Sequence, residues 1–344
     1  MPRKPTPVRV FSHVKHMVTR LRRNLTKDKT LLRRLIFGAA IILTGLAIAS
    51  VKFVEVSNAD PIKTIVAASQ NIVTPQPTGP AQTDAQFTQY PSWSQNFSTQ
   101  KSNVLSTQYW NVLTGPADNS NGEKQYYSND AANINVKDGA LHLTATKSAQ
   151  PNGYQYGSAR IESKGKKAFL YGRIDVTAKL PKGTGTWPAV WMLSDNEVYA
   201  NKTPASNPLH YRNGGEIDII EAVGYLPDQN YSVAHTASDV KLRNGSGAFG
   251  MVTVPNSASD YATYTLLWTP TQLTFMVNGT AYFTYNRPAN GDYTTWPYDQ
   301  PFYLVANLAI GGSWGGTKGI DDAALPSSLD IRSIYYYSYT GPTA

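Results

Sequence analysis

Three acidic residues stand close together in one short apolar segment of the sequence, Glu216-Ile-Asp218-Ile-Ile-Glu221. Side chains of an extended strand alternate between two faces, so Glu216 and Asp218 share a face while Glu221 would fall on the other. A lone carboxylate on the buried face would be costly. One extra residue, in a β-bulge around Ile219-Ile220, would return Glu221 to the face of the other two acids. We therefore predict a bulge and a surface that carries three carboxyl groups.

Carboxyl groups this close raise one another's pKa, so at least one of the three is expected to keep a proton near neutral pH. A protonated carboxyl beside an ionised one is the pair of groups that cleaves glycosidic bonds. The same acids could instead bind calcium or simply form a solvated strand face. The spacing ExDxxE does not separate these possibilities when it is taken alone.

Aromatic residues near the acidic segment favour carbohydrate chemistry. Trp187 and Trp191 lie four residues apart on one face of an expected strand, while Trp296 and Trp314 stand beside turns rich in Gly and Pro. Indole rings in such places could form flat platforms for sugar rings. His235 lies in an alternating segment and could reach the acidic face from a neighbouring strand.

These residues must be positioned by β-strands, because the sequence around them alternates between apolar and polar positions with a period of two. Asn278-Gly279 separates two such segments and suits a two-residue type I′ turn. No long amphipathic helix is evident after residue 60. The sequence thus predicts one all-β, antiparallel sandwich, with strands that include residues 140–146, 172–180, 261–268, 273–277 and 280–285.

Composition excludes several classes of protein. The 344 residues are 41% hydrophobic and 16% charged, which excludes a wholly disordered chain, and the absence of cysteine excludes disulfides and thiol catalysis. Gly311-Gly-Ser313-Trp-Gly fits the GxSxG pattern of serine hydrolases. No histidine follows Ser313, however, so the residue order of that catalytic triad cannot be met.

The net charge of +8 comes from the N-terminal end of the chain. Residues 1–34 hold 11 of the 31 Lys and Arg but one of the 23 acidic residues, and an uncharged run from Leu35 to Val51 follows. We interpret 1–34 as a cytoplasmic tail and 35–56 as a transmembrane signal-anchor, with no role in nucleic-acid binding. Cleavage near Ala49, as in a signal peptide, would instead release a secreted protein. Residues 57–88 are expected to be an extended linker, and 89–344 an extracellular, monomeric catalytic domain.

The acidic segment and its surroundings resemble glycoside hydrolase family 16. GGEIDIIEAVG at 214–224 is similar to the bulged ExDxxE signature of that family, in the branch that includes laminarinase-like endo-β-1,3-glucanases. The similarity extends over almost the whole expected domain, from Trp93 to Tyr337. Further segments in the family's order are 133–141, 171–174, 179–181, 185–193, 268–270, 296–304, 307–314 and 330–335.

This resemblance implies a concanavalin-like jelly roll whose concave sheet forms an open cleft for a polysaccharide. Glu216 matches the family's nucleophile, Glu221 the general acid/base, and Asp218 the carboxylate that orients the nucleophile. Aromatic residues of the cleft are matched by Trp187, Trp191 and Trp314. Polar groups near the cleft are matched by Asn133, Arg160 and His235.

The resemblance also raises the question of a metal. Asp330 matches a position that helps to bind a structural calcium ion in many relatives, on the convex side of the fold. Residues 93–97 (WSQNF) stand where those relatives have an acidic segment, which removes one potential ligand. Catalysis is expected to need no cofactor, and Asp330 stays the candidate calcium ligand.

We expect an endo-acting, retaining β-glucan hydrolase that works on β-1,3-glucan by double displacement. A bulged strand separates the Cα atoms of Glu216 and Glu221 by roughly 13 Å. Leaning side chains would bring the carboxyl groups to the separation of about 5–5.5 Å typical of retaining enzymes. A cell-wall glucan transglycosylase, a non-catalytic glucan-binding protein, and hydrolases of mixed-linkage or agarose-type glucans stay open as alternatives.

Overall fold

The computed structural model describes residues 80, 82–117, 121–195, 198–199, 214–239 and 247–342. The predicted basic tail (1–34), the predicted membrane span (35–56) and most of the predicted linker lie outside these residues. Among the residues described, no helix has the length and apolar character needed to cross a membrane.

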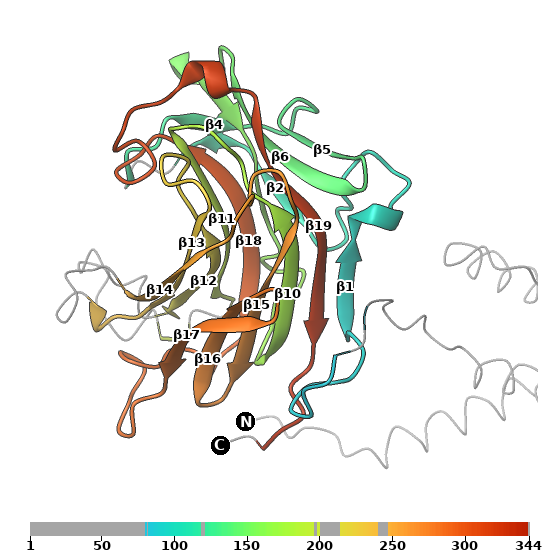
Figure 1. Ribbon diagram of the computed structural model, residues 1–344, viewed down its shortest axis with the longest axis vertical. Helices are drawn as coiled ribbons and strands as arrows, with labels where there is room; N and C mark the ends of the chain where they lie inside the picture. The colour runs from blue at the N-terminus through green and yellow to red at the C-terminus, as the bar shows by residue number, and fades with distance from the viewer. Residues whose placement is uncertain are drawn as a thin grey trace, which may run out of the picture. The chain divides into compact units, whose positions relative to one another are not determined.

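Two sheets form the predicted all-β sandwich, which is of the jelly-roll type (Figure 1). The back sheet runs in the order β17-β16-β15-β10-β19-β6-β7-β4-β3, with β1 paired to β19 and β5 paired to β6. Its strands are β1 (Trp93–Asn96), β3 (Gly115–Pro116), β4 (Gln125–Tyr127), β5 (Ile134–Lys137), β6 (Ala140–Lys147), β7 (Tyr156–Ser158), β10 (Gly172–Lys179), β15 (Ala262–Thr269), β16 (Gln272–Val277), β17 (Thr280–Asn286) and β19 (Ser327–Tyr337).

The front sheet runs in the order β14-β13-β12-β11-β18-β8-β2, with β9 paired to β18. Its strands are β2 (Asn111–Leu113), β8 (Arg160–Glu162), β9 (Ala168–Phe169), β11 (Thr186–Ser194), β12 (Glu216–Glu221), β13 (Gln229–His235), β14 (Ala248–Thr253) and β18 (Phe302–Ile310). Three short 3-10 helices complete the named elements: η1 (Phe97–Thr99), η3 (Pro151–Gly153) and η6 (Asp322–Ala324).

The strands predicted from alternation are confirmed. They appear as β6, β10, β15, β16 and β17 within one or two residues of the expected bounds. Asn278 and Gly279 both have positive φ values, 48° and 80°, as a type I′ turn requires. The hairpin β16–β17 therefore forms for the local reason that its sequence indicates.

The core lies between the two sheets and takes up the inward side chains of both. Val190 and Met192 of β11 point into it, while Trp187 and Trp191 alternate with them and point to the other face of the front sheet. Trp296, expected beside the cleft aromatics, is 1% exposed and stacks on Tyr285 at 5.9 Å between ring centroids. Trp296 is therefore a core residue, which corrects its interpretation as a platform.

The N-terminal end of the described chain is bound to the back sheet. Phe87 forms a β-bridge with Tyr339, and the amide of Thr88 donates a hydrogen bond to the carbonyl of Ser338. The hydroxyl of Tyr337 donates to the carbonyl of Pro80. Residues 82–88, assigned above to the linker, thus pack on the domain.

Candidate active site

The predicted bulge is present in β12. Across β11, Trp191 pairs with Asp218 and Val190 pairs with Ile220, which leaves Ile219 without a partner. The pairing of β12 with β13 shifts at the same place. Ile219 and Ile220 are both buried, at 1% and 0% exposure, so the inserted residue lies in the core and the prediction is confirmed.

As a result, the three acids share the outer face of the front sheet. Glu216 and Asp218 precede the bulge, Glu221 follows it, and the two glutamates are partly exposed. The cross-strand partners of the acids in β11 are Leu193, Trp191 and Ala189. These alternate with core residues, as do the acids themselves.

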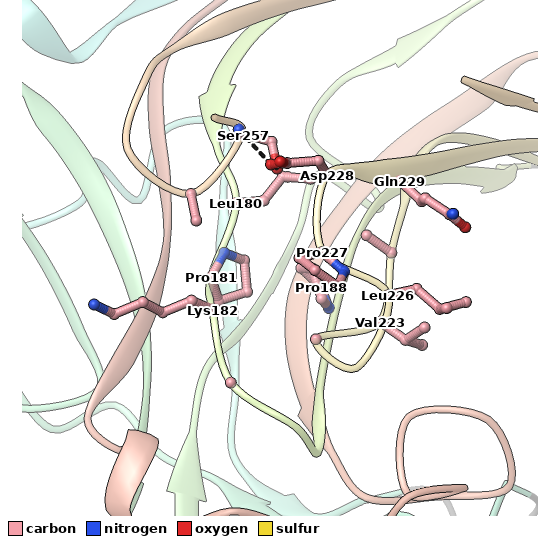
Figure 2. A pocket seen from close by; sticks show the side chains of 14 residues that line it. Leu180, Pro181, Lys182, Pro188, Val223, Leu226, Pro227, Asp228, Gln229 and Ser257 are labelled. Carbon is pink, nitrogen blue, oxygen red and sulfur yellow. Dashed lines mark hydrogen bonds between the residues drawn. The ribbon is translucent and has the colours of Figure 1, made fainter. Parts of the chain in front are cut away.

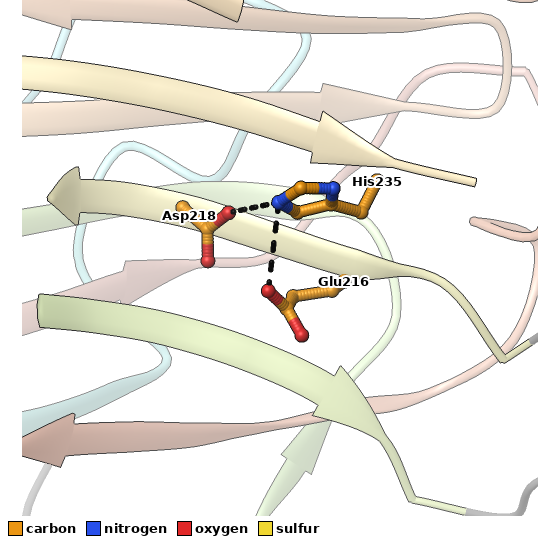
Figure 3. Close-up of side chains that lie close together, drawn as sticks. All are labelled: Glu216, Asp218 and His235. Atoms are coloured by element: carbon orange, nitrogen blue, oxygen red, sulfur yellow. Dashed lines mark ion pairs between the residues drawn. The ribbon is translucent and has the colours of Figure 1, made fainter. Parts of the chain in front are cut away.

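Glu216, Asp218 and His235 form one cluster at the start of β12 (Figure 3). His235 ends β13 directly opposite Glu216. Its Nε2 atom lies 3.4 Å from Oδ2 of Asp218 and 3.7 Å from Oε1 of Glu216. The structure therefore brings together the expected nucleophile, the acid beside it and the expected histidine. Their donor atoms, within 4.8 Å of one another, resemble a metal-ligand set, yet contacts between an imidazole and two carboxylates account for the cluster without an ion.

A fourth residue, Asp239, lies behind this cluster. Its Oδ2 atom is 3.7 Å from Nδ1 of His235 and accepts a hydrogen bond of 2.7 Å from the amide of Thr236. The side chain is fully buried. Burial opposes ionisation, but hydrogen bonds from His235 and Thr236 outweigh it and hold the pKa of Asp239 below its usual value. The imidazole is thus held between carboxyl groups on both of its nitrogens.

Glu221 sits in a different environment, under aromatic rings. The indole Nε1 of Trp187 donates a hydrogen bond of 3.0 Å to its Oε1 atom. Trp314 contacts Trp187 and Tyr231 edge to face, with ring centroids 5.7 and 5.0 Å apart. Since these two residues lie on the strands flanking β12, Trp314 spans the strand near Glu221.

Burial raises the pKa of Glu221 to about 7, and the hydrogen bond from Trp187 and the charge of His235 oppose this rise. This agrees with the expectation that one of the three acids keeps a proton near neutral pH, and Glu221 is that acid. The cause of the raised pKa differs from the one expected, because repulsion by Glu216 is the smallest contribution and loss of water is the largest.

Glycines hold Trp314 in this position. A Cβ atom on Gly315 would lie 2.8 Å from Cβ of Trp187 and 2.6 Å from the carbonyl oxygen of Gly311. A Cβ atom on Gly312 would lie 3.0 Å from the ring of Trp187. The Gly-rich loop can therefore pack closely on Trp187, and this contact directs Trp314 across β12.

Trp191 and Arg160 form a second wall on the other side of the acids. The indole of Trp191 donates a hydrogen bond of 2.7 Å to Oδ1 of Asn307, and the guanidinium carbon of Arg160 lies 5.1 Å from the indole ring. Arg160 pairs with Asn307 across β8 and β18, so both face the acids' side of the sheet. The buried Nε of Arg160 has no hydrogen-bond partner within the described chain.

Two predicted site residues lie elsewhere. Asn133 is 2% exposed, and its amide nitrogen donates to the carbonyl of Thr144 and the hydroxyl of Thr146 in the back sheet. Its polar side chain therefore braces β6, and too little of it is exposed to contact a sugar. This placement corrects its interpretation as a cleft residue.

Asp330, the candidate calcium ligand, is bound by protein donors on both oxygens. Oδ1 accepts from His142 at 2.7 Å and from Ser328 at 2.6 Å, and Oδ2 lies 3.1 Å from the ammonium of Lys179. Burial opposes ionisation, but the bonds from His142 and Ser328 outweigh it and lower the pKa of Asp330. A carboxylate that already neutralises a lysine, with no second acid beside it among the described residues, does not fit calcium, which takes six to eight oxygen ligands.

Sequence reasoning missed Tyr231, Asn307 and Asp239. Tyr231 stands four residues before His235 in an alternating strand, so its shared face with the histidine could have been found. Asn307 could be recognised only through its pairing with β11, and Asp239 only through the turn after β13 that returns it to His235. Sequence spacing carries no signal for either of these contacts.

A pocket also opens beside the site but on a different face (Figure 2). Pro188 lines it, and since Pro188 alternates with Trp187 along β11, it faces the interior rather than the acids. Asp228 in its wall accepts hydrogen bonds from the amide and hydroxyl of Ser257, which ties two turns together. The pocket contains no pair of acids and does not explain the chemistry.

Comparison with known proteins gives consistent results. Residues 121–324 match the family described as glycosyl hydrolases family 16. A beta-glucanase from Rhodothermus marinus is 34% identical over 252 residues, which cover 72% of this chain and 84% of that protein. The laminarinase structure from Rhodothermus marinus matches with a TM-score of 0.67 at 33% identity, covering 73% of this chain and 98% of the other. A third match is the structure of a mutant of a family 16 non-specific endo-β-1,3(4)-glucanase with 1,3-β-D-cellobiosyl-glucose at its active site. Its TM-score is 0.66 and its sequence identity 28%, and the match covers 76% of this chain and 99% of the glucanase chain.

Proposed function

Because the chain belongs to glycosyl hydrolases family 16, and so is a glycoside hydrolase similar to laminarinases, we propose that it is an endo-acting β-1,3-glucanase that retains anomeric configuration. The observation that carries this proposal is the placement of Glu216 and Glu221 on one face of a bulged strand in different surroundings. Glu216 lies beside His235, whereas Glu221 lies under aromatic rings, and burial raises its pKa to about 7. Such a difference between two carboxyl groups separates a nucleophile from an acid.

In the proposed mechanism, the carboxylate of Glu216 attacks the anomeric carbon while protonated Glu221 gives its proton to the leaving glycosidic oxygen. The C–O bond to the leaving sugar breaks and an ester between Glu216 and the glycosyl group forms. Ionised Glu221 then takes a proton from a water molecule, whose oxygen displaces Glu216. Asp218 and His235 orient Glu216 throughout. The chemistry of two carboxyl groups needs no cofactor.

We propose β-1,3-glucan as the substrate because laminarinases are among the similar proteins. Glucans with mixed β-1,3 and β-1,4 linkages are the second candidate, since a similar enzyme is described as a non-specific endo-β-1,3(4)-glucanase. Incubation of the protein with laminarin, mixed-linkage glucan and agarose, followed by sizing of the products, decides between these substrates. Internal cleavage of laminarin into oligosaccharides of several lengths is the expected result.

The stereochemistry is tested by NMR of the product formed first. A β-anomer released initially from laminarin is expected if Glu216 forms a covalent glycosyl-enzyme. Initial release of the α-anomer would show inversion and would refute the nucleophilic role of Glu216. Glu216→Gln is expected to abolish turnover while laminarin still binds, whereas loss of binding as well would point to a misfolded variant.

We also propose that residues 35–56 anchor the protein in the cell membrane, with the basic N-terminus in the cytoplasm and a monomeric catalytic domain outside. The uncharged run from Leu35 to Val51, directly after Arg33 and Arg34, supports this orientation. Cell fractionation and N-terminal sequencing test the proposal. Recovery of the intact chain with membranes is expected, whereas a secreted product that begins near residue 50 would show cleavage instead.

A further inference from the structure

The edge strand β14 presents two exposed apolar side chains on the face that carries the acids. Phe249 pairs with Val233 of β13, and Met251 pairs with Tyr231. Cross-strand partners point to the same side of a sheet, and Tyr231 is in turn the partner of Glu221. Phe249 is 55% exposed and Met251 48% exposed, although both are large apolar residues.

The opposite face of β14 fixes these two side chains in place. Its residues alternate strictly between partly buried and exposed along the whole strand. A Cβ atom on Gly250 would lie 2.3 Å from Cβ of Phe283 in β17, so the back sheet packs directly against β14 at this point. Six paired residues also bind β14 to β13. Phe249 and Met251 therefore project from a well-supported strand.

This surface is continuous with the aromatic cover of Glu221. The ring centroid of Phe249 lies 6.3 Å from that of Tyr231, and Tyr231 contacts Trp314, which contacts Trp187. Trp187 donates the hydrogen bond to Glu221. A row of aromatic rings thus leads from the proposed acid/base to the edge of the sheet, over two strand spacings or roughly 10 Å.

We propose that Phe249 and Met251 form an additional glucan-binding surface, which holds sugar rings of the chain beyond those bound next to Glu221. The inference rests on the proposed function and extends it. The C–H faces of β-linked glucose rings are apolar and match exposed aromatic and thioether side chains. The other half of the face combines the indole of Trp191 with the polar side chains of Arg160 and Asn307, so sugar binding there includes hydrogen bonds, while binding at β14 depends on apolar contact alone.

This division has a consequence for specificity. Hydrogen bonds fix the orientation of each hydroxyl group, whereas apolar contact tolerates rings that are rotated by a change of linkage. The β14 surface therefore selects for chain length and accepts both β-1,3 and mixed-linkage segments.

The test compares long and short substrates in Phe249→Ala/Met251→Ala. We expect kcat/KM for laminarin to fall about tenfold, because most of two apolar contacts is lost, while kcat/KM for a β-1,3-linked trisaccharide stays within about twofold. The variant Phe249→Trp/Met251→Ala, which has an aromatic ring at position 249 again, should recover most of the rate on laminarin. The matched control is Val104→Ala, since Val104 is 72% exposed and lies in the loop after η1, outside the front sheet. For Val104→Ala, the ratio of kcat/KM on laminarin to kcat/KM on the trisaccharide should equal that of the unaltered protein.

Binding is measured separately by the retardation of each protein in gels that contain laminarin, which needs no turnover. Weaker retardation of the double variant supports the proposal, and retardation equal to that of the Val104→Ala control overturns it. Equal losses on long and short substrates overturn it as well. A further contrary outcome concerns the oligomeric state. If the unaltered protein is a dimer, the double variant is a monomer, and the ratio of their rates on laminarin and trisaccharide is the same, the surface binds a second copy of the chain and the proposal is overturned. Absence of any hydrolysis by the unaltered protein refutes the proposed function, while the retardation result still decides this inference.

Discussion

Glu221 has two tasks in the proposed reaction that need opposite protonation states. It must carry a proton when the leaving sugar departs and must be ionised when water attacks the glycosyl-enzyme. A pKa of about 7 keeps both forms accessible near neutral pH. The aromatic rings around Glu221 therefore contribute to catalysis by removing water from a carboxyl group that would otherwise be ionised.

The hydrogen bond from Trp187 to Glu221 yields a prediction about pH. In Trp187→Phe, an aromatic ring is kept beside Trp314 but the N–H donor is lost, so ionised Glu221 is less stabilised and its pKa rises further. Since the acid must be protonated for the first step, the decline of kcat/KM at high pH should move upward by about one pH unit. Rate profiles between pH 5 and 10 on laminarin measure this shift.

Trp191→Phe is the matched control for that experiment. It also removes one indole donor on the same face of β11, but this donor binds Asn307 and not Glu221. We expect a lower rate at every pH, with no change in the position of the decline. A shift of the same size in both variants would mean that the indole of Trp187 does not control the pKa of Glu221.

Asp239 is expected to be a positioning residue that acts through His235. Asp239→Asn keeps the size of the side chain but removes the charge that faces Nδ1 of the imidazole. We expect kcat to fall about tenfold with little change in KM, because the orientation of Asp218 and Glu216 matters most in the transition state. Thermal unfolding supplies the control. A loss of activity that merely follows a lowered melting temperature would assign Asp239 a purely structural role.

The bulge in β12 is the element on which the active site depends, and it can be removed. Deletion of Ile219 gives a regular strand in which Glu216, Asp218 and the following glutamate again share one face, since an even number of steps separates them. The cost is one buried isoleucine, about 2–4 kcal/mol of the free energy of unfolding. We predict a less stable enzyme that retains measurable hydrolysis of laminarin.

An insertion should behave differently from the deletion. A single alanine added between Ile219 and Ile220 makes six steps between the two glutamates, so both stay on the outer face of a regular strand, but their Cα atoms then lie roughly 20 Å apart instead of roughly 13 Å. The carboxyl groups can no longer approach to about 5–5.5 Å, so activity should disappear while the fold is kept. Circular dichroism and laminarin hydrolysis, measured on both variants, separate these outcomes. Equal loss in the two variants would show that the catalytic geometry needs the bulge itself and not merely a shared face.

How much of the fold and the site can be predicted from the sequence depends on how far apart the interacting residues lie along the chain. Alternation and the Asn278-Gly279 turn are local, so the strands and one hairpin could be predicted. The bulge could be predicted because burial of Glu221 would be so costly. The contacts of Asp330 with His142 and Lys179 could not be predicted, because they join strands that are far apart in the sequence. The contact of Asn133 with Thr144 is local, since it lies across the β5–β6 hairpin, whose turn residues Asp138 and Gly139 both have positive φ.

At the scale of the whole molecule, both ends of the described chain meet on the back sheet, away from the acids. The side chain of Gln82 donates to the carbonyls of Phe87 and Thr88, and Thr340 donates its amide to the carbonyl of Gln86. Phe87 is buried, at 4% exposure, against the ring of Tyr339. The segment before β1 therefore packs on the residues that follow β19, whereas the acids belong to the front sheet.

This arrangement predicts where the folded domain begins. A protein that lacks residues 1–79 should keep full stability, whereas one that lacks residues 1–88 loses a buried phenylalanine and several backbone hydrogen bonds. The loss amounts to about 3–5 kcal/mol, which lowers the melting temperature of a domain of this size by roughly 10 °C.

Both proteins should hydrolyse laminarin with equal kcat at 25 °C, because the acids belong to the front sheet. Phe87→Ala in the longer protein should reproduce about half of the loss. Equal melting temperatures for the two truncated proteins would place the start of the domain at residue 89, and unequal kcat values would show that the terminal segment reaches the active site.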